Sequence, residues 1–467
     1  MNPEEMNNQL ITSIRVEKLF GLYTYRLPEK DSFSNAAILY GDNGVGKSTI
    51  LRLAFHLMSP ADNRGHRGAL YETDFNYLEV ILTSGVVLKA TRTQGTEPIY
   101  LKLSIEKNGK TVTAWDYAPK AERNLIDRDN IYIKRRSGGP EIELVSRKFI
   151  TSQKETKPDF PTGEAAYLSV LAEVTPKIFI LNAERRLDSD EVSDPSDEVE
   201  LRNVMRFEES KRINDLGTRS REIALSQALS AAGNWVARKA VQGANQGSMN
   251  VHSVYADVLH HLVAASSPEL KLSTQIDLGV LLTRLSLIES KTVELARYEL
   301  ATELSIEEFK KALNAPLEKR NLAAELLKPY IQSLEGRMEA VDPIYRIIDK
   351  FVKILNGFLF DKTIVFKLSK GFNIQNRNGL LLKPSQLSSG EQQLLLLFCY
   401  VLTGRDNPSV FMIDEPEISL NIKWQRILVQ SLLDIAEGTK TQFLFASHSL
   451  ELLAQHKNKV IKLVNSL

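Results

Sequence analysis

The pattern of hydrophobic and polar positions divides the chain into three stretches of different character. The first stretch is composed of short strands and turns, including a strong β-hairpin signal at Asn108-Gly109. The second is helical, and residues 275–302 carry leucines at spacings of three and four, which predicts one apolar helix face. The third alternates helices with short apolar strands at 410–413 and 442–446, which predicts an α/β layer with parallel strands.

These stretches predict two sequence-distant lobes and an insertion between them. The N-terminal lobe, with a β-meander, is predicted in residues 1–156, a mainly helical insert in 157–345, and the C-terminal lobe in 346–467. The insert has the size of an ordinary domain. We expect the two lobes to rejoin in space as a single α/β domain.

Composition narrows the class of protein. The 467 residues include 59 Lys and Arg against 58 Asp and Glu, a net charge of +1, with 43% hydrophobic residues, so a globular chain is expected rather than a disordered one. Cys399 is the single cysteine, which excludes a disulfide scaffold and a cysteine-ligated zinc site and favours the cytoplasm. The apolar run 394–402 is too short to span a membrane, so no membrane partner is expected.

A phosphate-binding loop is predicted at residues 41–48, GDNGVGKS, which match G-x-x-x-x-G-K-[ST]. An apolar strand precedes the loop and a helix follows it, so backbone N–H groups and the helix N-terminus can face phosphate oxygens. Lys47 can reach the β- and γ-phosphates, and Ser48 can ligate Mg²⁺. The predicted ATP-binding residues are Gly41, Asn43, Gly44, Val45, Gly46, Lys47, Ser48 and Thr49.

Two later strands end in further candidate side chains. The strand 410–413 is followed by Asp414, which suits a Mg²⁺ ligand, and by Glu415, which suits a group that orients or deprotonates the attacking water. A helix-length spacer leads to the strand that ends before His448. Because the carboxyl ends of parallel strands share one edge of a sheet, we expect His448 near the γ-phosphate, where an imidazole can sense phosphate or position water.

The stretch 387–393, LSSGEQQ, precedes the apolar run 394–402 and has two compatible interpretations. Serines followed by Glu and Gln are typical of a helix start. A serine and a glycine at a helix N-terminus also form an anion site. A partner chain would supply this site to the far side of the γ-phosphate, which makes Ser388, Gly390 and Glu391 candidate ATP-binding residues.

These four elements, in this order, resemble the ABC-type ATPase head, whose signature motif LSGGQ corresponds to LSSGEQ here. The resemblance implies an α/β fold, an ABC-type P-loop ATPase head with an antiparallel β-subdomain and an inserted helical domain, that hydrolyses ATP with Mg²⁺. It implies a head-to-head dimer in which Ser388 and Gly390 complete the partner's ATP site, with Glu415 as the catalytic base and His448 as the switch histidine. Gln153 would be the glutamine that senses Mg²⁺; the alternative is a polar surface residue.

A narrower resemblance covers most of the chain. The long separation between Lys47 and Ser388 is similar to that of the SMC and RecF-like branch. The runs IDEPEISLNIKWQ, ASHSLELL and IFILNAER are similar to runs of prokaryotic defence ATPases: the OLD nucleases, the Septu ATPases (PtuA) and the PARIS ATPases (AriA), the last being most similar. OLD-type proteins carry a Toprim nuclease after the head, and too few residues follow His448 for one.

This resemblance implies an anti-phage sensor and scaffold that holds and releases a separate nuclease. A Toprim-type nuclease is favoured, an HNH-type nuclease is the alternative, and a phage-encoded protein would be the trigger. The competing hypothesis is a RecF- or SMC-like DNA-repair ATPase stimulated by DNA, which the balanced charge makes less favourable. A third is a nucleotide-gated switch with negligible turnover, against which the intact Lys47, Asp414 and Glu415 argue.

Two further features keep two interpretations each. Arg185 could contact phosphate or a neighbouring head, or form a structural salt bridge. The acidic segment 188–200 could be a solvated linker or a docking surface for a basic partner.

Overall fold

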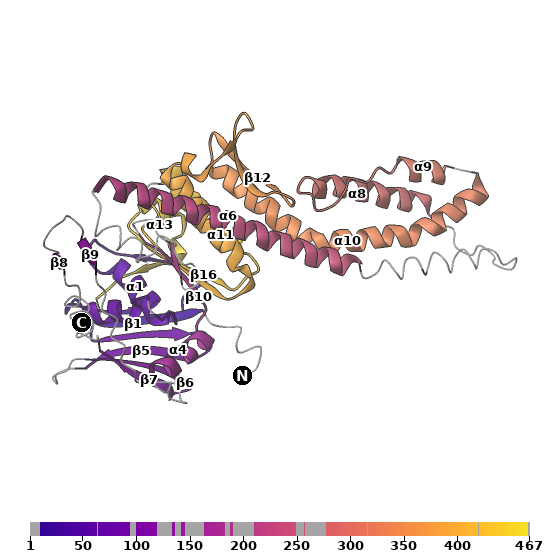
Figure 1. The fold of residues 1–467 in the computed structure, drawn as a ribbon. Coiled ribbons are helices and arrows are strands. Elements are labelled where there is room, and N and C mark those ends of the chain that lie inside the picture. Colours follow the sequence, from indigo (N-terminus) through magenta and orange to yellow (C-terminus); the bar gives the residue numbers. More distant parts are fainter. Residues whose placement is uncertain are drawn as a thin grey trace. The chain divides into compact units, whose positions relative to one another are not determined.

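The computed structural model describes residues 10–62, 64–93, 100–118, 133–135, 142–144, 163–182, 187–189, 210–248, 256, 277–314, 316–418 and 420–465. Gln153, Arg185 and the acidic segment after Ser189 lie outside the described residues. The chain forms two compact units (Figure 1). The head unit comprises Met1–Ser193, Gly404–Arg426 and Gly438–Leu467, and the helical unit comprises Asp194–Thr403 and Ile427–Glu437.

A six-stranded sheet that is mainly parallel organises the head unit. Its strands lie in the order β11 (Leu187–Ser189), β10 (Lys177–Leu181), β15 (Ser409–Asp414), β16 (Thr441–Ser447), β3 (Ala36–Tyr40) and β17 (Val460–Lys462). All pairs are parallel except β10 with β11. Every residue of β15 and β16 is buried, as expected for central parallel strands covered on both faces.

β10 lies in the stretch 157–345 that the sequence predicts as mainly helical. It nevertheless pairs in parallel with β15, with Ile178 opposite Val410. The compact units therefore place boundaries elsewhere than the three predicted segments. A strand of 5 residues next to helical patterns carries too little periodic signal to reveal its distant partner.

A second, antiparallel sheet of the head unit has the order β2-β1-β4-β5-β6-β7. Its strands are β1 (Ile11–Leu19), β2 (Tyr23–Leu27), β4 (Tyr77–Leu82), β5 (Val86–Arg92), β6 (Leu101–Lys107) and β7 (Lys110–Tyr117). The predicted hairpin at Asn108-Gly109 is confirmed as the β6–β7 turn, with Lys107 opposite Lys110. The helix α4 (Gly163–Val174) contacts β6 and β7. The remaining short elements of this unit are α2 (His66–Glu72), β8 (Ile133–Arg135), β9 (Ile142–Leu144) and α13 (Leu450–Gln455).

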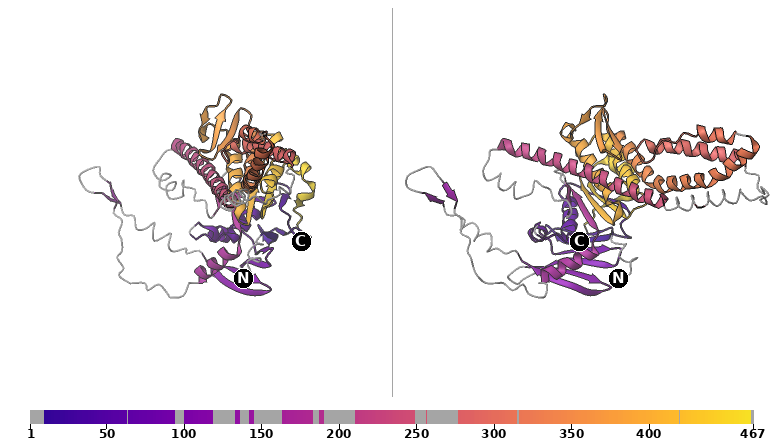
Figure 2. Two further views of the ribbon diagram at one scale, coloured as in Figure 1. Left: turned by 90° about the vertical axis from the view of Figure 1, so that its right-hand side faces the viewer. Right: turned by 45° about the vertical axis from the view of Figure 1, so that its right-hand side comes forward.

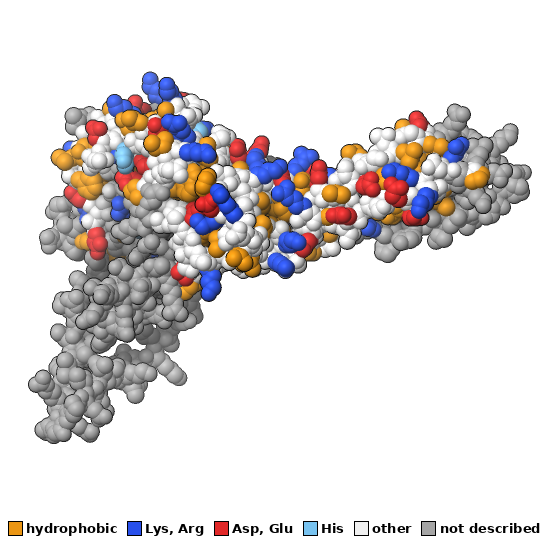
Figure 3. Space-filling view, turned by 90° about the horizontal axis from the view of Figure 1, so that it is seen from above, with side chains coloured by type: hydrophobic (Ala, Val, Ile, Leu, Met, Phe, Trp, Pro, Cys, Tyr) orange, Lys and Arg blue, Asp and Glu red, His pale blue; other side chains and the backbone are white. Residues whose placement is uncertain are grey.

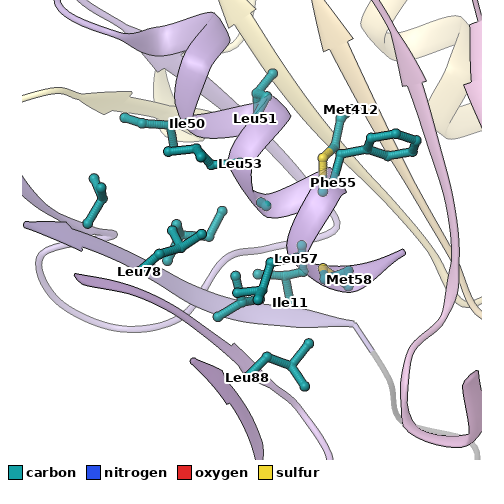
Figure 4. Close-up of a cluster of buried hydrophobic side chains, with 14 of the residues drawn as sticks. Ile11, Ile50, Leu51, Leu53, Phe55, Leu57, Met58, Leu78, Leu88 and Met412 are labelled. Carbon is teal, nitrogen blue, oxygen red and sulfur yellow. The ribbon is translucent and has the colours of Figure 1, made fainter. Parts of the chain in front are cut away.

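One apolar core joins the two sheets around α1 (Lys47–Met58). Figure 4 shows Phe55 of this helix beside Met412 of the parallel sheet, and Leu57 near Ile11 of the antiparallel sheet. All four side chains are almost completely buried. The helix that follows the phosphate loop is therefore held from both sides, which fixes the position of the loop at its N-terminus.

The helical unit contains four long helices and a small sheet among the described residues. These are α6 (Ser210–Ser248), α8 (Leu278–Ala296), α10 (Leu317–Phe358), α11 (Ser389–Thr403), the short α9 (Glu307–Leu313), and β12 (Lys362–Lys367), β13 (Gly371–Asn376) and β14 (Leu381–Leu382). α12 (Ile422–Ile435) is divided between the two units. α6 contacts α10 and α11, and the views in Figure 2 show it running alongside α10. The predicted apolar face of 275–302 is confirmed, since Leu281, Leu285 and Ile288 pack with Ile331.

Polar pairs at heptad spacing set the register of α8 against α10. Arg284 pairs with Glu335, Lys291 with Asp342 at 2.6 Å, and the Tyr298 hydroxyl donates to Asp349 at 3.0 Å. Because each pair lies one heptad beyond the last on both helices, α8 and α10 run parallel. Within the described ranges, each helix is too short or too polar to cross a bilayer. The predicted α/β class, with a parallel sheet, an antiparallel β-sheet and a helical part, is confirmed.

Candidate active site

The phosphate loop connects β3 to α1 and depends on glycine at two positions. Gly44 and Gly46 have φ angles of +85° and +92°, a region that other residues rarely adopt. At Gly46, an added Cβ would lie 2.6 Å from Leu19 Cδ2, so a larger residue would also collide with β1. The Tyr25 hydroxyl donates to the Val45 carbonyl at 3.0 Å, and burial raises the pKa of Tyr25 to about 12, which keeps this donor protonated.

Lys47 extends across the loop that it belongs to. Its ammonium donates to the carbonyls of Gly41 and Asp42 at 2.8 and 2.9 Å. The residue is buried, so these bonds offset the cost of removing the charge from water. A phosphate held by the loop N–H groups would lie within reach of the same ammonium.

Ser48 and Asp414 are far apart in sequence but in direct contact in space. The Ser48 hydroxyl donates to Asp414 Oδ1 at 2.6 Å, because α1 passes beside β15. Burial raises the pKa of Asp414, while the Ser48 hydrogen bond and the positive charges of Arg52 and Lys47 partly oppose the rise. A hydroxyl next to a carboxylate is the oxygen set that suits Mg²⁺ beside a nucleotide. Among the described residues, no cluster of three or more His, Cys, Asp or Glu could hold a metal, so phosphate and water would complete its coordination.

Glu415 follows the last residue of β15 in an uncommon backbone conformation. Its φ angle is +47°, which costs a non-glycine residue about 1–3 kcal/mol. Its backbone N–H donates to the Ala446 carbonyl at 2.8 Å, so pairing with β16 continues through this residue. The strained conformation is thus held by the sheet at the edge that carries the phosphate loop.

His448 follows β16, between the Asp414 strand and the strand of the phosphate loop. The register places Asp414 opposite Ala446, and Ser447 opposite Tyr40. The imidazole is half exposed, and its Nδ1 lies 3.8 Å from Glu415 Oε1. The structure therefore brings Lys47, Ser48, Asp414, Glu415 and His448 to one edge of the parallel sheet; their roles remain predictions.

Glu417 is a buried carboxylate of this edge that the sequence analysis missed. Its Oε1 accepts hydrogen bonds from the Ser447 hydroxyl at 2.8 Å and from the backbone N–H groups of His448 and Ser449 at 2.9 and 3.1 Å. The signal available in the sequence was a third acidic residue in the run Asp414–Glu417. It was overlooked because Asp414 and Glu415 already accounted for the expected carboxylate chemistry.

The signature residues lie in the helical unit, at the start of α11. The Glu391 carboxylate accepts from the Ser388 N–H at 2.7 Å, from its hydroxyl at 2.9 Å and from the Lys362 ammonium at 3.0 Å. Burial opposes ionisation, but these donors together lower the pKa of Glu391 below its usual value. The interpretation as a capped helix start is confirmed, while nucleotide contacts of Ser388, Gly390 and Glu391 stay predictions.

A pocket of about 480 Å³ opens beside the phosphate loop in the head unit. Its lining includes Phe20, Thr49, Arg52, His56 and Asp74, so it combines an aromatic ring with charged and polar groups. Burial, with His66 and two arginines nearby, lowers the pKa of His56 to about 4, so this imidazole is neutral at pH 7. Thr49 joins the pocket to the loop, because it directly follows Ser48.

Residues 283–454 match a family model described as "AAA domain, putative AbiEii toxin, Type IV TA system". The match includes the signature, Asp414, Glu415 and His448, and supports an ATPase of the AAA/ABC type. No curated protein matches the chain.

Two solved structures illustrate the similarity at the level of shape. The Smc head domain with an extended coiled coil, bound to the C-terminal domain of ScpA and derived from Pyrococcus furiosus, is 11% identical, with 96% of this chain and 91% of that chain covered and a TM-score of 0.33. The Smc head domain with a coiled coil and joint from Pyrococcus yayanosii is 13% identical, with 96% and 93% covered and a TM-score of 0.32.

Proposed function

We propose that this chain is an ABC-type ATPase that binds ATP and hydrolyses it with Mg²⁺. The observation that carries the proposal is the convergence of Lys47, Ser48, Asp414, Glu415 and His448 at one edge of the parallel sheet. The match of residues 283–454 to an AAA domain supports the same chemistry.

The phosphate loop supplies binding. Its N–H groups and the N-terminus of α1 face the phosphates, and Lys47 exchanges its two loop carbonyls for phosphate oxygens. Mg²⁺, held by Ser48 and Asp414, neutralises charge on the β- and γ-phosphates. The pocket beside Thr49 provides room for the base of the nucleotide.

Glu415 supplies the proton acceptor for hydrolysis. A bond forms between the oxygen of a water molecule and the γ-phosphorus, and the bond from the γ-phosphorus to the bridging oxygen breaks. ADP leaves with the electron pair of the broken bond, and the proton of the water passes to the Glu415 carboxylate. His448 orients the γ-phosphate from the neighbouring strand end.

We assign this ATPase to anti-phage defence, as a sensor and scaffold whose ATP-bound form holds a separate nuclease. A head-to-head dimer would complete each site with Ser388 and Gly390 of the other copy. A Toprim-type nuclease is the favoured partner, an HNH-type nuclease the alternative, and a phage protein the trigger. Support comes from the defence-ATPase runs and from a family model whose description names a toxin of a toxin–antitoxin system.

Replacing Glu415 by glutamine tests the ATPase assignment. E415Q keeps the shape of the side chain but removes the proton acceptor, so we expect phosphate release to slow by about 10²- to 10⁴-fold. Equilibrium binding of ATP should be retained. Glu308→Gln, an exposed glutamate on α9 in the helical unit, is the matched control and should hydrolyse ATP at the wild-type rate. Unchanged hydrolysis by E415Q would remove Glu415 from the mechanism.

The same variant tests the assignment to defence. Co-expressed with its neighbouring gene, tagged E415Q loaded with ATP should retain a nuclease that the Lys47→Ala variant loses. If DNA instead stimulates hydrolysis and no nuclease is retained, the DNA-repair hypothesis replaces the scaffold role.

A further inference from the structure

The carboxylate of Glu417 connects the loop after β15 to the loop after β16. One oxygen, Oε1, accepts from Ser447, His448 and Ser449, while the side chain is only 7% exposed. Burying a carboxylate is costly unless donors replace water. Here the three donors come from three consecutive residues around His448, so the burial of Glu417 is compensated by that loop.

The second oxygen of Glu417 shows how this carboxylate is used. Oε2 is buried and has no hydrogen-bond partner in the part of the chain that the structure describes. A buried oxygen without a donor lowers stability, and such groups in folded proteins call for an explanation. All hydrogen bonds of this carboxylate therefore run through Oε1 to the His448 loop.

Glu417 is also the carboxylate nearest to the imidazole. Glu417 Oε1 lies 3.2 Å from His448 Nδ1, against 3.8 Å for Glu415 Oε1. Glu415 is 27% exposed, whereas Glu417 is buried and held by three donors. Since two lone pairs that face each other repel, a fixed carboxylate oxygen at this distance favours a proton on Nδ1.

We propose that Glu417 is the positioning residue of His448. It holds the loop backbone at His448, selects the imidazole form with the proton on Nδ1, and leaves Nε2, on the far side of the ring, for the γ-phosphate. The inference rests on the proposed function, in which His448 acts on ATP. Glu415 remains free to serve the attacking water, so the two glutamates have separate roles.

A double-mutant cycle on ATP turnover tests whether Glu417 acts through His448. Glu417→Gln keeps an oxygen that can accept from the loop but loses the charge. We expect its kcat to fall about tenfold, the loss typical when a group that orients a histidine is removed, with KM for ATP nearly unchanged. The double variant with His448→Ala should be no slower than His448→Ala alone. If the two losses multiply instead, Glu417 acts independently and the proposal is wrong.

Glu451→Gln is the matched control. Glu451 lies three residues after His448, is partly exposed and pairs with Arg426 at 2.8 Å. This variant removes a glutamate charge close to the same loop without touching the site, so kcat should match the wild type. Thermal unfolding of each variant checks that slower turnover does not come from loss of folded protein.

Nitrogen NMR of histidine-labelled, full-length protein provides a readout that needs no hydrolysis. The His448 signals are those missing from His448→Ala, and they should show a protonated Nδ1 and an unprotonated Nε2. In Glu417→Gln the proton should redistribute between the two nitrogens. A wild-type His448 with its proton on Nε2 would overturn the inference. A wild-type protein without turnover would instead overturn the proposed function, while these signals would still decide the pairing.

Discussion

Asp414 lies almost fully buried at the end of β15, where the Ser48 hydroxyl donates to its Oδ1. Burial raises its pKa because it penalises the charged form. The folded-state pKa therefore lies above the unfolded value of about 4, and the protein loses stability as the pH rises through this interval. At neutral pH the whole penalty is present, so the metal-binding carboxylate destabilises the nucleotide-free fold.

Asp414→Asn should consequently stabilise the protein while it inactivates the site. Asparagine keeps the shape and an oxygen for Ser48 but carries no charge. We expect the thermal midpoint of the nucleotide-free protein to rise at pH 7, and the gain over wild type to vanish below about pH 4. ATP turnover should fall by roughly two orders of magnitude, the size typical for a group that stabilises transition-state charge.

Calorimetry across this pH range and a phosphate-release assay measure the two effects. A lower midpoint than wild type at pH 7 would show that the attraction of Arg52 and Lys47 outweighs burial, and would reverse the sign of the pH dependence.

The contact between α6 and α10 depends on a glycine within a helix. At Gly243, an added Cβ would lie 2.6 Å from the backbone oxygen of Ala340, closer than real Cβ contacts allow. At Gly336, in the middle of α10, an added Cβ would meet nothing within 4 Å. The two positions share helix propensity but differ in packing, so they separate these two contributions to stability.

Gly243→Ala should therefore destabilise the protein, although alanine favours a helix over glycine by about 1 kcal/mol. Gly336→Ala should gain up to about that amount, since no clash opposes the propensity. Urea unfolding of both variants gives the two free energies. Changes of the same sign in both would mean that α6 and α10 move apart at no cost, and that Gly243 is not required for their packing.

Several elements follow from local sequence, and others depend on tertiary contacts. The apolar runs 410–413 and 442–446 and the Asn108-Gly109 turn carry enough pattern to predict β15, β16 and the β6–β7 hairpin. α10 was harder to predict because it continues through Pro329 and Pro343, residues that usually end or kink a helix. Packing against α6 and α8 outweighs that local preference.

The candidate site divides in the same way. The positions of Ser48 and Asp414 follow from a motif and a strand end, and the structure joins them at 2.6 Å. The role of Glu417 depends on amides 31 and 32 positions away in sequence, which only the parallel pairing of β15 and β16 brings near. No local pattern contains that information.

At the scale of the whole molecule, charge argues for protein partners over extended contact with nucleic acid. The net charge is +1, and Figure 3 shows Lys and Arg side chains interspersed with Asp and Glu over the described part of one face. Strong nonspecific binding to DNA depends on clustered positive charge. The larger question is therefore how copies of this chain cooperate, because the phosphate loop and the signature belong to different compact units.

If each nucleotide is held between two copies, two inactive variants should restore activity when mixed. Lys47→Ala removes the loop ammonium, and Ser388→Arg blocks the signature. A mixed dimer has one site with both defects and one with neither. Random exchange makes half of the dimers mixed, so an equal mixture should recover roughly a quarter of wild-type turnover. Mixing the doubly substituted chain with either single variant leaves no intact site and is the control. A mixture no more active than its components would mean that the signature does not complete a site across two copies.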